Sequence, residues 1–295
     1  MVRAGLDSAE ITERFAERGI KRTQKAIQRK RERETRKDPM GWHAMVAPAP
    51  KCAPRFDQPA VLVADRALTI FDLHAPFHDA AWINWVIGTA LRFGCDACII
   101  GGDLVDFAAF SKWGRQERVE AEDEIRTARQ IVNALARSFD QVVYGAGNHE
   151  MRLPRITGNL LELRDAMEMF VNAPNVTVSD YHYSILVSAG IEYQVEHPKN
   201  ASSIPTRVPT KLAEKYHRHI LAGHGHLWGQ ARDVSGEYWG IDAGICADPL
   251  RLAYNAKTHN TRPMMNQGAA LVLDGIPMLL EPATRALVDR LAWAA

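Results

Sequence analysis

Histidine, aspartate and asparagine residues stand together in five short clusters, most of them at the ends of predicted strands. The clusters are Asp72-x-His74, Gly102-Asp103-x-x-Asp106, Gly147-Asn148-His149-Glu150, His197 and Gly223-His224-x-His226. Divalent cations take carboxylate oxygen and neutral imidazole nitrogen as ligands. A structural zinc site instead prefers four Cys or His ligands and has no open position. The clusters therefore favour a catalytic metal site.

The segment 98–106 shows how a fold would deliver such ligands. An apolar run at 98–100 is followed by two glycines and then by Asp103 and Asp106. A short apolar run predicts a buried strand, and glycines at its end let a ligand approach the backbone closely. Taken alone, the run is explained equally well by an Asp that caps the next helix. The other four clusters favour the metal site.

The elements around the clusters alternate between strand and helix from Val61 onward. Strands are predicted at 67–71, 97–100, 141–144, 183–187, 191–196 and 219–222, and helices at 79–93, 117–139, 160–171 and 209–217. Two hairpins follow, turning near Ser235-Gly236 and Asp274-Gly275, before a last helix from Pro282. Alternation followed by antiparallel strands predicts an α/β fold with two mixed sheets packed face to face and helices outside.

The five clusters, in this order, resemble the motifs of the calcineurin-like metallophosphoesterases. The similarity runs from Asp72 to His226. It implies a four-layer α/β/β/α sandwich that holds two divalent metal ions at the sheet ends. Manganese is our expectation, and Fe, Zn and Ni suit the same ligands.

The resemblance also assigns roles, residue by residue. Asp72, His74 and His226 would bind the first metal, Asn148, His197 and His224 would bind the second, and Asp103 would bridge the two. A hydroxide between the metals would be the nucleophile. His149 would act as the general acid that protonates the leaving oxygen, and Asp106 would orient its imidazole and raise its pKa.

Two histidines carry open alternatives. His197 lies before Pro198, where the family commonly has a glycine, so His182 competes with it as the ligand. His78 follows His74 by four residues and would contact substrate, unless it is an ordinary loop histidine.

The substrate is less well defined by the sequence. Related protein phosphatases follow the second Asp with a phosphate-binding Arg, whereas Phe107 follows Asp106 here. Basic side chains that would replace that Arg in binding substrate are Arg152, Arg155, Lys112 and Arg115, with Trp113 available to stack on a base. Each of them could equally be an exposed loop residue.

The N-terminal region is strongly basic. Residues 1–37 hold 12 Lys and Arg against 6 Asp and Glu, although the whole chain carries a net charge of only +1. Two helices, at 7–18 and 23–36, flank Gly19 and resemble a basic helix-turn-helix arm that would bind nucleic acid. A solvated basic helix without a partner is the alternative. A proline-rich linker is expected at 38–60, and the metallophosphoesterase domain at 61–295.

These features lead to one leading hypothesis and two alternatives. The first is a dimetal phosphodiesterase or nuclease that its arm concentrates on DNA or RNA. The second is a phosphomonoesterase acting on nucleotides or other small phosphoesters, and the third is a DNA-binding protein without catalysis. The run 72–79 and Met265-Asn266-Gln267-Gly268 loosely resemble phage- or prophage-encoded members.

Composition indicates the cellular location and the absence of a disulfide framework. No apolar run approaches the roughly 18 to 20 residues of a membrane span, and the N-terminus is charged, so we expect no membrane partner and a cytoplasmic location, in the host if the chain is phage-encoded. Four scattered cysteines do not form a disulfide framework. The oligomeric state is not indicated.

Overall fold

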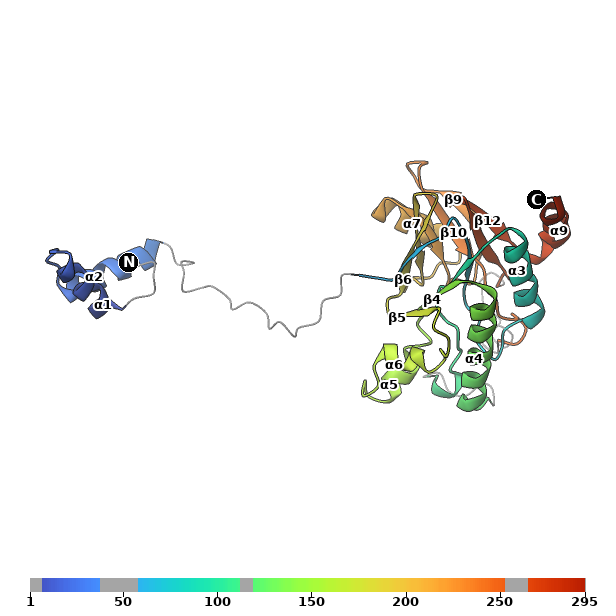
Figure 1. The fold of residues 1–295 in the computed structure, drawn as a ribbon, viewed down its shortest axis with the longest axis horizontal. Helices are drawn as coiled ribbons and strands as arrows, with labels where there is room; N and C mark the ends of the chain where they lie inside the picture. The colour runs from blue at the N-terminus through green and yellow to red at the C-terminus, as the bar shows by residue number, and fades with distance from the viewer. Residues whose placement is uncertain (1–6, 38–57, 112–118, 253–264, 295) are drawn as a thin grey trace. The chain divides into compact units, whose positions relative to one another are not determined.

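The computed structural model describes residues 7–37, 58–111, 119–252 and 265–294. The chain divides into two compact units, Met1–Phe56 and Asp57–Ala295 (Figure 1). Two helices, α1 (Ser8–Glu17) and α2 (Gln24–Lys37), form the described part of the first unit.

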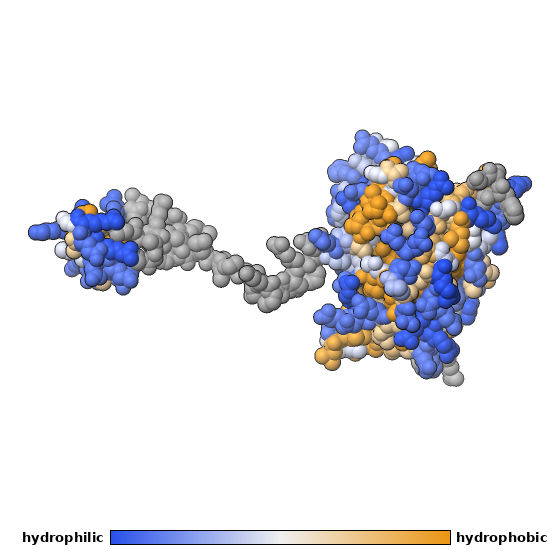
Figure 2. Space-filling view, in the orientation of Figure 1, coloured by the Kyte–Doolittle hydropathy of each residue, from blue (hydrophilic) through white to orange (hydrophobic). Residues whose placement is uncertain are grey.

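The two N-terminal helices form where capping residues start them. The Asp7 carboxylate accepts hydrogen bonds at the start of α1, and Glu10 returns a bond to the Asp7 amide, which completes a capping box. Thr23 accepts a hydrogen bond at the start of α2. Ile11 and Ile27 are buried, while the surface of these helices is largely hydrophilic (Figure 2). The predicted helices are confirmed; most of the predicted linker, residues 38–57, lies outside the described residues.

The second unit contains two six-stranded mixed sheets. Sheet A has the order β1-β6-β7-β8-β10-β9, and sheet B has the order β12-β11-β2-β3-β4-β5. The strands of sheet A are β1 (Val61–Val63), β6 (Tyr183–Ser188), β7 (Ile191–Glu196), β8 (His219–Ala222), β10 (Trp239–Ala243) and β9 (Trp228–Arg232). The strands of sheet B are β12 (Ile276–Leu280), β11 (Ala269–Leu273), β2 (Arg66–Ile70), β3 (Ala97–Ile100), β4 (Gln141–Gly145) and β5 (Val176–Ser179).

Helices cover the outer face of each sheet, which makes four layers. The helices are α3 (Ala80–Arg92), α4 (Ala121–Ser138), α5 (Arg152–Ile156), α6 (Leu163–Glu168), α7 (Arg207–Tyr216) and α9 (Arg285–Ala294), with 3-10 turns η2 (Ala108–Phe110) and η3 (Pro282–Thr284). One apolar core joins α3, α4 and α9 to sheet B, a second lies between the sheets, and a third joins α7 to sheet A. The predicted α/β/β/α sandwich of two mixed sheets is therefore confirmed (Figure 1).

The helices of the outer layer follow directly from the sequence pattern. Asp79 caps α3 by accepting a hydrogen bond from the Trp82 amide at 2.9 Å. In α4, the buried residues Ala128, Ile131 and Leu135 recur at helical spacing and form a single apolar face.

The parallel strands bring their following loops to one end of the molecule. In sheet B, Ile70 is in register with Ile100, and Ile100 with Tyr144. In sheet A, Glu196 at the end of β7 is in register with Ala222 at the end of β8. Loops that follow parallel strands in register leave from the same edge. Each of the five clusters follows one of these strands, in the order β2, β3, β4, β7 and β8.

Two sequence predictions in this unit need correction. The helix predicted at 160–171 covers only Leu163–Glu168, because Gly158 and Asn159 adopt left-handed conformations ahead of it and Glu162, its N-cap, is still extended. Strands β1 and β5 were not predicted as elements, since each is a short, partly exposed strand at the edge of its sheet.

Candidate metal centre

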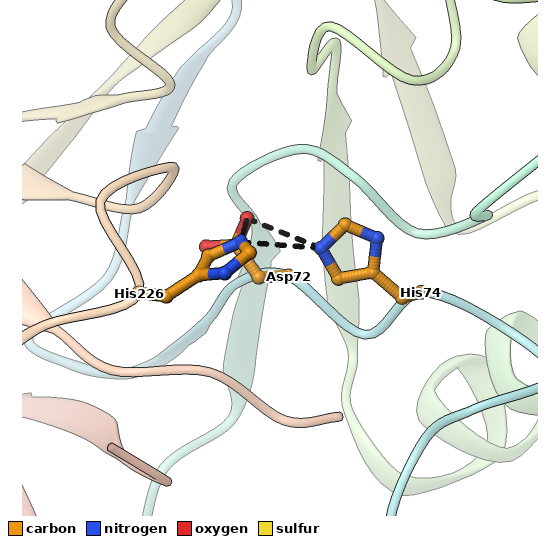
Figure 3. A group of neighbouring side chains, drawn as sticks. All are labelled: Asp72, His74 and His226. Carbon is orange, nitrogen blue, oxygen red and sulfur yellow. Dashed lines mark hydrogen bonds and ion pairs between the residues drawn. The ribbon is translucent and has the colours of Figure 1, made fainter. Parts of the chain in front are cut away.

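A first group of ligand atoms forms around the Asp72 carboxylate. Asp72 Oδ1 lies 3.2 Å from His226 Nε2 and 3.7 Å from His74 Nε2, and the two imidazole nitrogens are 3.3 Å apart. Figure 3 shows both rings directed toward the carboxylate. Asp72 and His74 are fully buried. The three side chains present one oxygen and two nitrogens to a common point, as a metal ion requires.

A second group forms beside it around His197. His197 Nε2 lies 3.3 Å from Asp103 Oδ2 and 3.2 Å from Asn148 Oδ1. His197 Nδ1 lies 3.2 Å from the Gly101 carbonyl, which fixes the ring and leaves Nε2 to face the centre. His224 joins Asp103 and His197 in this group.

Asp103 belongs to both sides of the centre. Its Oδ2 atom is 4.0 Å from His74 Nε2 and 3.3 Å from His197 Nε2, whereas its Oδ1 atom accepts a hydrogen bond from the His149 amide at 2.8 Å. One oxygen is therefore held by the backbone, and the other lies between the two groups. This is the position that the resemblance gives to a bridging carboxylate.

The backbone of the centre is unusual at most of the candidate ligands. Asp72, His74, Asp103, His224 and His226 all have positive φ, between 46° and 67°. Left-handed conformations are uncommon for residues other than glycine and are found preferentially at functional sites. The surrounding hydrogen bonds hold this geometry, since the Asp72 and His74 amides donate to the Gly102 and Asp103 carbonyls.

Two glycines permit the close approach of the loops. Gly102 has φ 103°, and a Cβ there would meet the Gly147 backbone and the His197 ring. A Cβ at Gly147 would overlap the Asp103 carboxylate. Only glycine fits at either place.

His149 and Asp106 lie next to the first group. Asp106 Oδ1 is 3.1 Å from His149 Nδ1 and 3.0 Å from His74 Nδ1, so this carboxylate contacts two histidines. His149 Nδ1 also donates to the Asp106 carbonyl at 2.8 Å. His149 Nε2 is 3.7 Å from Asp103 Oδ2 and therefore faces the centre. The contact between Asp106 and His74 is not predicted by the sequence.

Arg152 is the predicted substrate-binding residue that the structure brings to this place. Its guanidinium donates to the Asp106 carbonyl at 2.6 Å and lies 3.1 Å from His149 Nε2. A guanidinium cannot accept a hydrogen bond, so His149 Nε2 is the acceptor in this arrangement. The guanidinium therefore covers the ring nitrogen that the resemblance gives to the general acid.

The acids and imidazoles of the centre shift one another's pKa values. Burial works to raise the pKa of Asp72 and of Asp103, but the surrounding histidines outweigh it and lower both. Burial works to lower the pKa of His74, but hydrogen bonds to Asp106 and Asp72 raise it to about 10.

The two histidines of the second group shift in opposite directions. Burial alone would lower the pKa of His197, but the charge of Asp103 raises it to about 9. For His224, burial and the charge of His197 lower the pKa to about 4. The excess negative charge of the carboxylates is thus compensated by protonated imidazoles, and divalent cations would replace those protons.

The donor set fits a pair of divalent cations. It consists of carboxylate and amide oxygens and imidazole nitrogens, which suit Mn, Fe, Zn or Ni. The free cysteines of the described residues, Cys95, Cys98 and Cys246, are buried in strands and loops outside these groups.

The other predicted substrate-binding residues lie outside the ligand groups or outside the described residues, and His182 takes no part as a ligand. His78 is partly buried next to Ala247, outside the ligand groups. Arg155 is exposed on α5. Lys112 and Arg115, together with Trp113, lie outside the described residues. His182, the competitor of His197, contributes only its backbone carbonyl, which accepts from the His197 amide at 2.7 Å.

Glu150 stands in the third sequence cluster without a role that the sequence indicates, and the structure shows one. Its fully buried carboxylate accepts hydrogen bonds from the amides of Asp103, Leu104 and Gly147 and from the Tyr144 hydroxyl, at 2.8 to 3.1 Å. It therefore fastens the loop after β3 to the loop after β4. The signal available in the sequence was an acidic residue directly after Asn148-His149, at the end of a predicted strand.

Comparison with known proteins finds similarity only among solved structures. No family model and no curated protein matches the chain. The phosphoesterase YfcE from E. coli is 14% identical, with a TM-score of 0.37 over 70% of this chain and 87% of its own. Vacuolar protein sorting 29 from Cryptosporidium parvum is 11% identical, with a TM-score of 0.39 over 74% and 96%. The nuclease MPE from Pseudomonas putida is 15% identical, with a TM-score of 0.30 over 72% and 87%.

Proposed function

We propose that this chain is a calcineurin-like metallophosphoesterase that hydrolyses phosphodiesters with two divalent metal ions. The observation that carries the proposal is the position of Asp103 Oδ2 between the two ligand groups, 4.0 Å from His74 Nε2 and 3.3 Å from His197 Nε2. Asp103 would hold two ions close together, and such a pair would stabilise both the attacking and the leaving oxygen of one phosphoryl group. The order of the motifs in the sequence supports the same assignment.

The side chains around the metal positions would have separate roles in the reaction. When bound, the ions would acidify a water molecule and polarise the phosphoryl group. His149 Nε2 faces the centre, where it would give a proton to the leaving oxygen. Asp106 holds the opposite ring nitrogen of His149 and so keeps the ring in this orientation. Arg152 is the donor that would move from His149 to a phosphoryl oxygen as substrate enters.

A diester substrate is supported by the residue next to Asp106. Phe107 is fully buried and packs its ring against Phe110 and Phe170. It supplies no cation where related protein phosphatases have their phosphate-binding arginine. A nucleic-acid diester is further supported by α2, which carries most of the basic residues of the arm.

The chemistry of the ligands limits the choice of metal. We propose manganese as the working metal, with Fe, Zn or Ni as substitutes that the same ligands accept. In the part of the chain that the structure describes, none of the helices combines the length and apolar character needed to cross a bilayer.

The test is a comparison of two chromogenic substrates in Mn²⁺. Bis-p-nitrophenyl phosphate is a diester and p-nitrophenyl phosphate a monoester, and the proposal predicts faster turnover of the diester. Faster turnover of the monoester would identify a phosphomonoesterase instead. Turnover of neither, with duplex binding that weakens as salt is added, would identify a non-catalytic DNA-binding protein.

A further inference from the structure

Glu124 on α4 is a buried acid that lies outside the ligand groups. The residue is fully buried, and its Oε1 atom accepts a hydrogen bond from the Ala108 amide at 3.0 Å. Its Oε2 atom is enclosed and has no hydrogen-bond partner within the described part of the chain. Burial of a carboxyl group costs free energy that its contacts must offset. This carboxyl group is directed at the turn that follows Asp106.

The segment Asp106–Ala108 makes an unfavourable turn. The Asp106 amide still donates to the Ala75 carbonyl at 3.1 Å, and the chain then turns through Phe107, which has φ 49°. A left-handed conformation is an outlier for a bulky residue, so the surroundings have to hold it. The hydrogen bond that Ala108 donates to Glu124 restrains the chain directly after Phe107.

The same turn carries the groups that orient His149. The Asp106 carbonyl accepts hydrogen bonds from His149 Nδ1 at 2.8 Å and from Arg152 at 2.6 Å. The Asp106 carboxylate lies 3.1 Å from the same ring nitrogen of His149. Glu124 therefore holds the turn on its amide side, while His149 and Arg152 contact its carbonyl side.

Glu124 holds the turn without placing a full negative charge beside Asp106. Burial and the charge of Asp106 raise the pKa of the Glu124 carboxyl group to about 8. Hydrogen bonding by the Ala108 and Phe107 amides acts against this rise without cancelling it. The carboxyl group is therefore mainly protonated at pH 7, and an uncharged acceptor is sufficient for this contact. The side-chain carbonyl of glutamine would provide one.

We propose that Glu124 is a positioning residue for the general acid. It fixes the turn Asp106–Ala108, and Asp106 in turn holds Nδ1 of His149, so that Nε2 faces the centre. The proposal rests on the proposed phosphodiesterase function and adds a residue of α4 that is not among the ligand groups. Loss of the Glu124 acceptor should therefore slow the reaction most where the leaving oxygen needs a proton.

The test compares two diesters in Mn²⁺ with the full chain. Thymidylyl-thymidine has an alkoxide leaving group that must be protonated, whereas bis-p-nitrophenyl phosphate has a good leaving group. Glu124→Met fills a similar space but offers only a weak acceptor. It should lower kcat on the dinucleotide about 10- to 100-fold more than on bis-p-nitrophenyl phosphate, the effect of a misplaced catalytic group, with KM unchanged. Glu124→Gln keeps the acceptor and should keep the wild-type ratio of the two rates.

Two controls on α4 separate positioning from stability. Glu122→Ala removes an exposed acid close to Glu124, and Ile131→Ala removes buried apolar contacts about two helical turns further along. Both should keep the wild-type ratio, although Ile131→Ala should lower the melting temperature. An unchanged ratio in Glu124→Met, or an equally lowered ratio in Glu124→Gln, would overturn the positioning role. Should Glu124→Met not fold, Glu124→Asp, which withdraws the acceptor by one methylene group, is judged by the same criteria.

The orientation of the His149 ring separates this proposal from the proposed function. If the wild type cleaves neither diester, the phosphodiesterase function fails, and NMR of the ¹⁵N-histidine-labelled full chain in diamagnetic Zn²⁺ decides the role of Glu124. The His149 signal, identified by its absence from His149→Ala, should show the proton on Nδ1, which donates to the Asp106 carbonyl. Glu124→Met should lose this preference, and Glu124→Gln should keep it. A wild-type ring without the Nδ1 proton, or a Glu124→Met ring that retains it, would overturn the positioning role.

Discussion

Asp103 uses its two carboxylate oxygens for different purposes. Oδ1 is fixed by the His149 amide, and Oδ2 is left between the two ligand groups. Fixing one oxygen orients the other, so the side chain loses little additional freedom when ions bind. The same loop contact places His149 next to the centre. Ligand geometry and general-acid geometry therefore depend on one hydrogen bond.

Substitution of His149 separates its chemistry from metal binding. His149→Ala should lower kcat by about 10²- to 10⁴-fold on a diester with an alkoxide leaving group, since that oxygen must be protonated as it leaves. The loss should be smaller with p-nitrophenolate, a good leaving group. Metal content should be unchanged, because His149 is not among the assigned ligands. His217→Asn, far along the sequence and in a left-handed position that Asn tolerates, is the control that should retain activity. Full activity of His149→Ala on the poor leaving group would remove the general-acid role.

The raised pKa values of His74 and His197 predict how pH acts on the metal-free protein. Both are raised above the unfolded value, to about 10 and about 9, so their stabilising contribution is complete below about pH 6.5 and is lost as pH rises through 9 to 10. The melting temperature in EDTA should therefore fall between pH 7 and pH 10. With Mn²⁺ the fall should disappear, because metal binding needs the deprotonated rings. An unchanged or rising melting temperature in EDTA would contradict this assignment.

At the scale of elements, the centre depends on loops from two sheets meeting without intervening side chains. Gly147 lies against the Asp103 carboxylate, and Gly102 lies against Gly147 and His197. Glu150 then ties the loop after β3 to the loop after β4. The sheets set the direction of these loops, and the glycines and Glu150 set their separation.

A methyl group at Gly147 should disrupt this meeting of loops. Gly147→Ala would push Asp103 out of place, so we expect loss of metal binding and a stability loss of about 1 to 3 kcal/mol from overpacking. Gly88→Ala in α3 is the matched control, since its Cβ meets no atom within 4 Å, and it should be neutral or slightly stabilising. Calorimetric titration with Mn²⁺ and urea unfolding measure both effects. Tight metal binding by Gly147→Ala would show that the close approach is not required.

The sequence predicts the positions of the strands and helices better than it predicts which strands pair with one another. The strands at Ala97–Ile100 and His219–Ala222 agree with prediction at both ends, because apolar runs bounded by turns are local signals. The insertion of β10 between β8 and β9, and the parallel pairing of β1 with β6, depend on contacts between distant segments that no local pattern encodes. The left-handed backbone at His74 and the contact of Arg152 with His149 could not be predicted for the same reason.

At the scale of the whole chain, the basic arm lies in one compact unit, Met1–Phe56, and the candidate metal centre in the other, Asp57–Ala295. Removal of residues 1–37 should leave turnover of bis-p-nitrophenyl phosphate intact, because the assigned ligands all lie between Asp72 and His226. Binding to duplex DNA should weaken, and its dependence on salt should become less steep as phosphate contacts are lost. Fluorescence anisotropy across a salt series measures both. As a control, Arg29→Glu in the full chain should weaken binding in the same direction, and unchanged affinity in both proteins would refute the role of the arm.

The central claim is that Asp103 joins two metal positions in one site. Calorimetric titration of chelator-treated full chain with Mn²⁺ tests it directly. We predict two ions bound per chain in the wild type and impaired binding of both in Asp103→Ala, since its Oδ2 atom is shared by the two ligand groups. A single ion per chain, no binding, or two ions bound with unchanged affinity in Asp103→Ala would contradict it.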